Sequence, residues 1–179
     1  GEQVVGITMG LANISELRLK VAKEQADNFR DLLVSYSEDP RVILIKLADR
    51  LEVMRSLEMF PREKWRKKSW ESMNLYAQIA HKLGLYSIKS ELEDIALKYL
   101  EPKDYEHVVT KLEESAEERK AFIGRFLVPI EQRLNRLGIK YHIKSRTKSI
   151  FSIWNKMRKQ HVPFEGVYDI FAIRIILDL

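Results

Sequence analysis

The sequence has no cysteine among its 179 residues. This excludes a disulfide framework, a zinc site with cysteine ligands and a catalytic thiol, and it fits a reducing compartment. Seven glycines and five prolines are too few for a collagen-like or low-complexity chain. No apolar run approaches the ~18 residues that cross a membrane, and the first residues lack the basic and apolar regions of a signal peptide. We therefore expect a cytoplasmic protein without a membrane partner.

The composition is that of a folded, basic protein. Hydrophobic residues make up 45% of the chain and charged residues 32%, so a sizeable core can form. The length suggests one domain or slightly more. The net charge of +5 points to anionic partners such as nucleotides or nucleic acids.

Both ends of the chain suggest an internal fragment. The first residue is Gly1, and the stretch from Ile170 to Leu179 is rich in β-branched residues, as in a buried strand. A buried strand needs neighbours on both edges and a layer over each face. We expect an incomplete last domain; the alternative is a short edge strand in a complete domain.

The first hundred residues have the apolar period of amphipathic helices. Asp39 and Pro40 suit an N-cap and a first helical position, Gly84 ends a helix, and Glu101 with Pro102 stops the last one. The residues predicted to face inward are Ala22, Ala26, Phe29, Leu32, Leu33 and Tyr36 in one helix, Val42, Ile45, Ala48, Leu51 and Met54 in the next, then Trp65, Met73, Tyr76, Ala77 and Ala80, and finally Ile88, Leu92, Ile95, Ala96 and Tyr99.

The helical pattern continues over residues 102–137, with a break or kink expected near Gly124 and Pro129. The acidic run over residues 113–118 is interpreted as a solvated helix face; the alternative is a cation site. After Gly138 the pattern alternates as in a strand, becomes helical over residues 150–157, and ends in the apolar strand. This order of strand, helix and strand predicts the opening of an α/β domain.

The stretch from Lys140 to Gln160 holds seven basic residues and no acid. Arg146 and Lys148 lie where the strand gives way to the helix, whose N-terminus favours anions. Ser152 and Lys156 lie four residues apart and share one helix face. These groups suit a polyphosphate; the alternatives are a solvated basic face or a nucleic-acid patch.

Two aspartates are candidate metal ligands. Asp169 precedes the apolar strand, where it can bind Mg²⁺ opposite the basic cluster, or it can be a turn residue. Asp49 lies in an apolar helical setting, where a buried carboxylate is paired or metal-bound, and Arg50 and Arg55 are possible partners. The four histidines form no pair at ligand spacing, so the sequence shows no complete metal centre.

The segment PREKWRKKSW, residues 61–70, interleaves basic residues with tryptophan. Such a segment can stack on nucleic-acid bases. The preferred interpretation is the start of an amphipathic helix whose tryptophans are core residues.

Four separated motifs resemble the RelA/SpoT family, the long stringent-response enzymes that make and degrade (p)ppGpp. RVILIKLADRLEVMRSLE (residues 41–58) resembles the last metal-ligand helix of the family's hydrolase domain, and YAQIAHKLGLYSIKSELEDIALKYLEP (76–102) the segment that follows. SRTKSIFSIWNKM (145–157) and YDIFAIRIIL (168–177) resemble the opening motif and next strand of the synthetase domain.

The resemblance implies a mainly α fold. Residues 1–100 would be the C-terminal part of an HD-type hydrolase domain, 101–138 a helical linker, and 139–179 the truncated start of an α/β nucleotidyltransferase-like synthetase domain. It also implies transfer of pyrophosphate from ATP to the 3′-hydroxyl of GDP or GTP. In some members a C-terminal region absent here senses the ribosome.

The resemblance assigns roles on the synthetase side. Arg146 would contact the ATP donor, Lys148, Ser152 and Lys156 would line the phosphate and nucleotide pocket, and Asp169 would be the catalytic aspartate that binds Mg²⁺. The family's guanine-stacking tyrosine and second acidic residue would lie beyond Leu179, so the isolated chain is expected to be inactive in synthesis.

On the hydrolase side the resemblance makes Asp49 the last ligand of a Mn²⁺ site whose other ligands are absent from this chain. Glu52 and Val53 replace the family's usual His and Asn, and Val53 cannot hydrogen-bond a substrate. Hydrolysis is therefore either lost or retained in a rearranged pocket. Two other hypotheses stay open: a basic helical module that binds nucleic acid, and a helical scaffold with a vestigial site.

Overall fold

The computed structural model describes residues 1–16 and 39–178. The helix predicted over residues 22–36 lies outside these ranges. The chain divides into two compact units, Gly1–Leu100 and Glu101–Leu179, and each is described by itself. Within the described residues, no helix is both long and apolar enough to cross a membrane.

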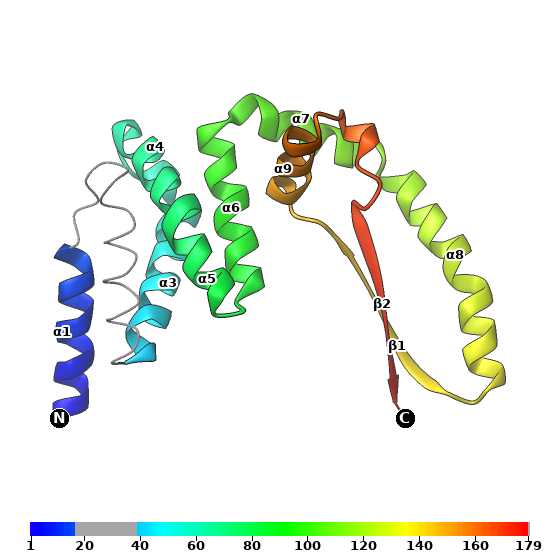
Figure 1. The fold of residues 1–179 in the computed structure, drawn as a ribbon, viewed down its shortest axis with the longest axis horizontal. Helices are drawn as coiled ribbons and strands as arrows, with labels where there is room; N and C mark the ends of the chain where they lie inside the picture. The colour runs from blue at the N-terminus through cyan, green and yellow to red at the C-terminus, as the bar shows by residue number, and fades with distance from the viewer. Residues whose placement is uncertain (17–38, 179) are drawn as a thin grey trace. The chain divides into compact units, whose positions relative to one another are not determined.

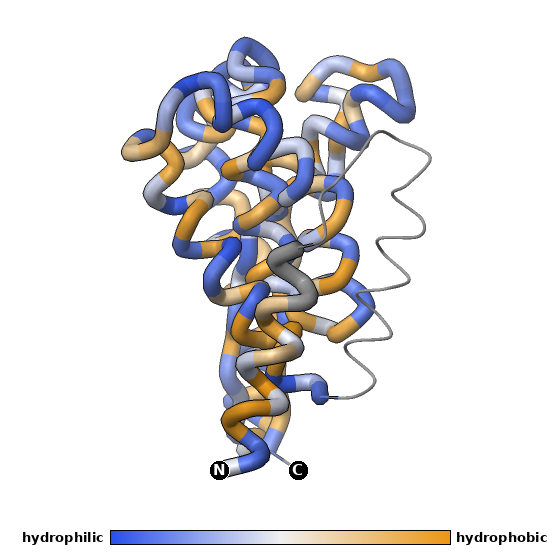
Figure 2. Tube along the Cα trace, turned by 90° about the vertical axis from the view of Figure 1, so that its left-hand side faces the viewer, coloured by the Kyte–Doolittle hydropathy of each residue, from blue (hydrophilic) through white to orange (hydrophobic). Residues whose placement is uncertain are grey.

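The first unit is helical (Figure 1). Apolar and polar residues alternate around the turns of its helices, as amphipathic packing requires (Figure 2). Its elements are α1 (Glu2–Glu16), α3 (Pro40–Arg55), the 3₁₀ turn η1 (Leu57–Met59), α4 (Arg62–Glu71), the π-helical turn η2 (Ser72–Tyr76), α5 (Ala77–Lys82) and α6 (Tyr86–Leu100).

The start of α3 confirms the predicted cap. The Asp39 side chain accepts a hydrogen bond from the backbone N–H of Arg41 at 3.0 Å, and Pro40 occupies the first helical position. Proline suits this position because its missing N–H would have no partner in the first turn. The cap fixes the residue at which α3, the helix that carries Asp49, begins.

The core of the first unit is formed by α3, η1, η2, α5 and α6, with Leu47, Leu57, Leu92 and Ala96 fully buried. Helix α1 approaches α3 closely at Gly10, where an added Cβ would lie 2.9 Å from a Val42 methyl. A larger side chain at Gly10 would therefore push the two helices apart.

The inward face of α3 differs from the predicted one. Ile45 is 43% exposed and Ala48 is also exposed, whereas Ile43 and Leu47 are buried. The run VILI is apolar around the whole helix, so its period could not show which side would be covered. Val42, Leu51 and Met54 face inward as predicted.

Two further helical predictions for this unit are confirmed. Tyr76, Ala77 and Ala80 are buried, and Trp65 and Met73 pack against the core. Helix α6 ends at Leu100, directly before Glu101 and Pro102. The sequence did not predict η2, the π-helical turn that widens the helix between α4 and α5.

The second unit contains three helices and a two-stranded antiparallel sheet within its described part. Its elements are α7 (Pro102–Glu114), α8 (Ala116–Arg136), β1 (Lys140–Thr147), α9 (Ile150–Gln160), the 3₁₀ turn η3 (Phe164–Gly166) and β2 (Phe171–Asp178). A small core of Val108, Ile153 and Phe164 joins α7, α9 and η3.

The expected break near Gly124 and Pro129 does not occur, and its alternative, a kink, stays a prediction. Helix α8 runs through both residues, and the helical break falls at Ser115 instead. Pro129 is tolerated because α8 has no buried residue, so water can satisfy the carbonyl that proline leaves without its helical partner. Helix α8 ends before Gly138, whose φ of +67° suits glycine at a helix terminus.

The two strands form a ribbon in which Lys140 pairs with Asp178 and Thr147 with Phe171. The predicted strand at the end of the chain is confirmed, and within the described residues it is partly exposed, as expected of a strand whose neighbours this chain does not supply. Alternate residues of β2 are half-buried and the others exposed, with Ile176 at 38%. This alternation is typical of a strand with one covered face. Phe171 contacts Phe122 of α8 on the covered side.

Candidate polyphosphate and metal site

The N-terminus of α9 is held by a serine cap. Ser149 is the N-cap, and its hydroxyl lies 2.7 Å from the hydroxyl of Ser152. The backbone N–H of Ser152 donates to the same Ser149 oxygen at 3.3 Å. Ser152 is therefore fixed in the first turn of α9, where free backbone N–H groups favour an anion.

The loop before β2 is anchored beside this helix. The backbone N–H of Lys148 donates to the carbonyl of Ile170 at 2.8 Å. This bond places Asp169, the residue before Ile170, next to the junction of β1 and α9. The sequence predicted a carboxylate opposite the basic cluster, and the structure brings the two together.

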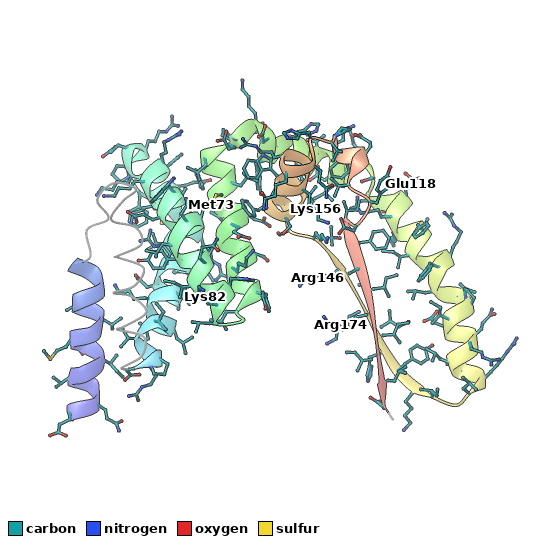
Figure 3. The ribbon with its side chains drawn as sticks, viewed as in Figure 1. Met73, Lys82, Glu118, Arg146, Lys156 and Arg174 are labelled. Atoms are coloured by element: carbon teal, nitrogen blue, oxygen red, sulfur yellow. The ribbon has the colours of Figure 1, made fainter. Side chains whose placement is uncertain are left out.

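Asp169 is bound by two lysines. The ammonium groups of Lys148 and Lys156 both donate to its Oδ2 atom. Lys148 comes from the end of β1 and Lys156 from α9, where Figure 3 labels it. The three side chains are half-buried to half-exposed, so a ligand can reach them from solvent.

The lysines set the protonation of this cluster. Hydrogen bonds from Lys148 and Lys156 lower the pKa of Asp169 from 3.8 to about 2, so the carboxylate is ionised at neutral pH. The same hydrogen bond raises the pKa of Lys156. The site therefore joins one ionised carboxylate to two lysine ammonium groups.

A basic surface extends from this cluster along the exposed face of the ribbon. Arg146 and Lys144 lie on the exposed face of β1, and Lys144 is directly opposite Arg174 of β2. Figure 3 shows Arg146 and Arg174 on the ribbon. Like charges opposite each other are unfavourable without a counterion, so this face is suited to an anion. Arg174 was not among the predicted site residues; its signal in the sequence is a charge inside an apolar strand.

Asp49 does not have the surroundings that the sequence predicted. Its side chain is exposed rather than buried, and the two arginines pair elsewhere: Arg50 with Glu71 at 3.0 Å, and Arg55 with Glu91 at 2.6 Å. Among the described residues, no three His, Asp or Glu side chains are grouped closely enough to hold a metal ion. Mn²⁺ would therefore find one ligand here among the described residues.

The residues beside Asp49 also face solvent or pair locally. Glu52 is 74% exposed and lies 3.8 Å from Arg55. Ser56 donates its hydroxyl to the carbonyl of Glu52 at 2.8 Å. The carboxylate at position 52 therefore interacts with its own helix and is not directed toward Asp49.

The neighbouring ion pair of Arg50 and Glu71 is buried. The guanidinium of Arg50 also lies 4.2 Å from the centre of the Tyr76 ring, in the π-helical turn. Burial and the Arg50 charge lower the pKa of Lys68 on the same helix as Glu71. The sequence did not predict this pair, because its members are 21 residues apart.

The segment over residues 61–70 is mainly structural. Trp65 packs against the core and donates its indole N–H to the carbonyl of Phe60 at 2.7 Å. Trp70 is 38% exposed. Trp65 is therefore a core residue, as the preferred interpretation predicted, but the same prediction is wrong for Trp70, which faces solvent.

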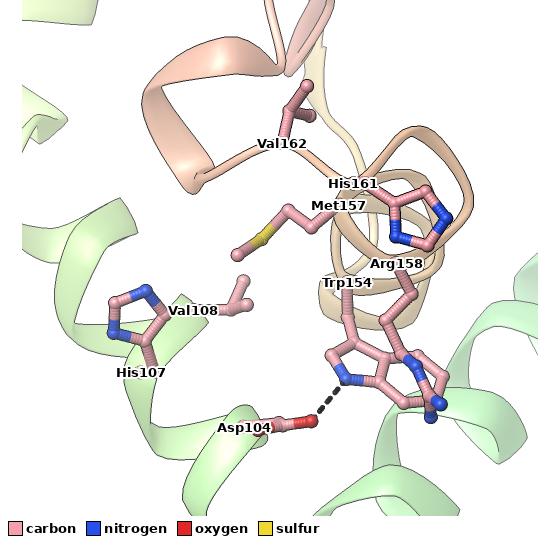
Figure 4. Close-up of a pocket in the computed structure, with 8 residues that line it drawn as sticks. All are labelled: Asp104, His107, Val108, Trp154, Met157, Arg158, His161 and Val162. Atoms are coloured by element: carbon pink, nitrogen blue, oxygen red, sulfur yellow. Dashed lines mark hydrogen bonds between the residues drawn. The ribbon is translucent and has the colours of Figure 1, made fainter.

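A separate cavity of about 440 Å³ lies between α7 and α9 (Figure 4). Its wall includes Trp154, whose indole N–H donates to Asp104 at 2.7 Å. The guanidinium of Arg158 lies 5.0 Å from the centre of the same indole ring. The hydrogen bond ties α9 to α7 and so supports the helix that carries Ser152 and Lys156.

Comparison with known proteins supports the order of the two units. The family model described as HD domain matches residues 1–86, and the model described as "Region found in RelA / SpoT proteins" matches residues 145–179. The second match contains Lys148, Lys156 and Asp169. An HD-type helical part followed by a RelA/SpoT region is the class that the fold and these matches define.

Curated relatives align with almost the whole chain. Guanosine-3′,5′-bis(diphosphate) 3′-pyrophosphohydrolase of Aquifex aeolicus is 41% identical over 99% of the chain, which covers 25% of that protein. GTP pyrophosphokinase of Myxococcus xanthus is 34% identical over 98% of the chain, which covers 24% of that protein. The bifunctional (p)ppGpp synthase/hydrolase SpoT of Escherichia coli is 35% identical over 99% of the chain, which covers 26% of that protein.

The chain belongs to the RelA/SpoT family, since both models and these relatives agree. It spans about a quarter of the length of the curated relatives it matches. The mainly helical fold with the start of a RelA/SpoT region is confirmed. The predicted domain boundaries at residues 100 and 138 stay a prediction. In the structure, residues 101–138 belong to the same compact unit as the ribbon.

Proposed function

We propose that the protein transfers the β,γ-pyrophosphate of ATP to the 3′-hydroxyl of GDP or GTP, forming (p)ppGpp. The observation that carries this proposal is the convergence of Lys148 and Lys156 on Asp169 within the RelA/SpoT region. The names of the relatives, which include GTP pyrophosphokinase, support the same reaction. The reaction belongs in the cytoplasm, where these nucleotides are supplied.

The side chains on this surface suit the charge of the donor. Lys148 and Lys156 would bind oxygens of the triphosphate, and Arg146 would supply a planar guanidinium that binds ATP. Ser152, fixed by Ser149, would donate to a phosphate oxygen. In the reaction the 3′-hydroxyl loses its proton to water, its oxygen forms a bond to the β-phosphorus, the bond from that phosphorus to the bridging α,β-oxygen breaks, and AMP leaves. The positive charges of the lysines stabilise the charge that develops.

Asp169 fits a Mg²⁺ ligand. It is ionised at neutral pH and half exposed, and Mg²⁺ in phosphoryl-transfer sites takes one or two carboxylates together with phosphate oxygens and water. When bound, the metal neutralises charge on the phosphates. The described residues bring one carboxylate to this place, so we expect activity from the full-length protein and not from these 179 residues alone.

A second activity is hydrolysis of the 3′-pyrophosphate of (p)ppGpp in the first unit. The HD-domain match over residues 1–86 favours it, and Asp49 would supply one ligand to Mn²⁺. Val53 and Glu52 bring no hydrogen-bond donor to this helix face, so we propose that hydrolysis is weaker than synthesis.

The proposal is tested by equilibrium binding of α,β-methylene-ATP, which cannot transfer its pyrophosphate, in the presence of Mg²⁺. Replacement of Lys156 by Met should weaken binding about tenfold, and Lys159→Met, which removes an exposed charge from the same helix, should not. Equal binding by both variants contradicts the site. Preference for a long nucleic acid, with an affinity that falls steeply with salt, would support the nucleic-acid alternative.

A further inference from the structure

The carboxylate that suits a metal ion is already occupied by two cations. Lys148 and Lys156 donate to the same oxygen of Asp169, and among the described residues neither lysine pairs with another acid. The side chains of Lys148 and Lys156 are 27% and 36% exposed, against 53% for Asp169. The carboxylate is thus reachable from solvent but neutralised by its neighbours.

A free divalent cation that approaches Asp169 meets two ammonium groups at the same oxygen. It must displace both lysines or accept their repulsion, and either costs binding free energy. A polyphosphate changes this balance, because its oxygens offer the lysines other acceptors of the same charge.

The lysines can move while the carboxylate stays in place. The backbone of Lys148 is bound to the Ile170 carbonyl, which holds the loop carrying Asp169. Lys156 projects from α9, whose first turn is fixed by Ser149. Only flexible side-chain bonds need to rotate for either ammonium group to leave Asp169.

We propose that Lys148 and Lys156 keep Asp169 closed to a free divalent cation, and that a polyphosphate opens the carboxylate by drawing both ammonium groups onto its own oxygens. The second part rests on the proposed function. Metal and polyphosphate then bind cooperatively, and each raises the affinity of the other by the same factor. A bare metal ion does not occupy the site.

The first test uses Mn²⁺ alone, with bound metal measured by electron paramagnetic resonance, and every protein compared, including the one called wild type, carries Asp49→Asn to remove the candidate Mn²⁺ ligand of the first unit. The wild type should bind weakly, and Lys148→Met and Lys156→Met should each bind Mn²⁺ about tenfold more tightly. Lys159→Met controls for the loss of one positive charge from α9 and should bind like the wild type. Asp169→Asn, added to either lysine variant, should remove the gain in Mn²⁺ affinity. Circular dichroism verifies that each variant is folded.

The opposite sign of two effects distinguishes this inference from the proposed function. The same lysine substitutions should tighten Mn²⁺ and weaken α,β-methylene-ATP. If the analogue binds and the wild type binds Mn²⁺ alone as tightly as the lysine variants, the inference is overturned and the proposed function stands. If the lysine variants gain Mn²⁺ affinity but no variant binds the analogue, the proposed function fails and only the closure by lysines stands.

Discussion

Lys156 of α9 donates a hydrogen bond to the carboxylate of Asp169, which lies 13 residues later in the chain, just before β2. The contact joins the helix that follows the first strand to the loop that precedes the second. It therefore reports directly on whether this part of the chain is folded, and it fixes the charges on which the proposed reaction depends.

Acid should remove part of the stability that Asp169 provides. Its pKa falls from 3.8 to about 2 on folding, so the ionised form stabilises the folded state above pH 3.8, and this contribution is lost as the pH falls toward 2. The Asp169→Asn variant should thus be less stable than the wild type at pH 6, and the difference should shrink below pH 4. Urea midpoints at a series of pH values measure it; a constant difference contradicts the ion pair.

The buried pair of Arg50 and Glu71 should contribute to the stability of the first unit. Glu71→Gln leaves a buried guanidinium without its counterion, so we expect a loss of about 3 kcal/mol in the free energy of unfolding. Urea unfolding followed by circular dichroism measures it. Glu52→Gln is the matched control, because its solvent-exposed pair with Arg55 should contribute little to stability. Similar losses in both variants would contradict the role of burial.

Arg174 should stabilise ligand binding at the expense of the ribbon. Arg174→Met removes the like charge opposite Lys144, so the melting temperature of the chain should stay the same or rise. The same change should weaken α,β-methylene-ATP binding about tenfold, because one cation is lost from the basic face. A variant that binds the analogue as tightly as the wild type places Arg174 outside the site.

Hydrolysis should respond to the two positions on α3 in opposite directions. Asp49→Asn should lower Mn²⁺-dependent release of pyrophosphate from ppGpp by at least about tenfold. Val53→Asn should raise it, because an amide can hydrogen-bond the substrate where valine cannot. The assay uses the full-length protein. No change in either variant would remove the hydrolase role from this helix.

Local pattern was enough to predict most elements of the second unit. The alternation of apolar and polar residues over 139–143 predicted β1, and the helical period over 150–157 predicted α9. Both patterns were informative because each element has one covered face. Of the break or kink predicted at Gly124 and Pro129, the break does not occur, since an exposed helix tolerates both residues. The covered side of α3 was also not predictable, because Ile43 and Ile45 are equally apolar and only packing distinguishes them.

The candidate site was predictable only in part. Spacing placed Ser152 and Lys156 on one helical face and Lys148 at the junction before that helix, but the lysine contacts to Asp169 depend on how the chain returns from α9 to β2. Asp49 shows the converse. The apolar segment around Asp49 suggested that its carboxylate is buried. Asp49 is exposed because another face of α3 meets the core.

The most direct test of the central claim is pyrophosphate transfer by the full-length protein with ATP, GDP and Mg²⁺. Asp178→Asn, at the other end of the same strand, is the matched control, because its carboxylate is 55% exposed and contacts only His142 across the ribbon, at 4.0 Å, among the described residues. We predict a guanosine 3′-diphosphate product from the wild type and Asp178→Asn, and a loss of at least about 100-fold in Asp169→Asn. Equal product formation by folded Asp169→Asn would contradict the account.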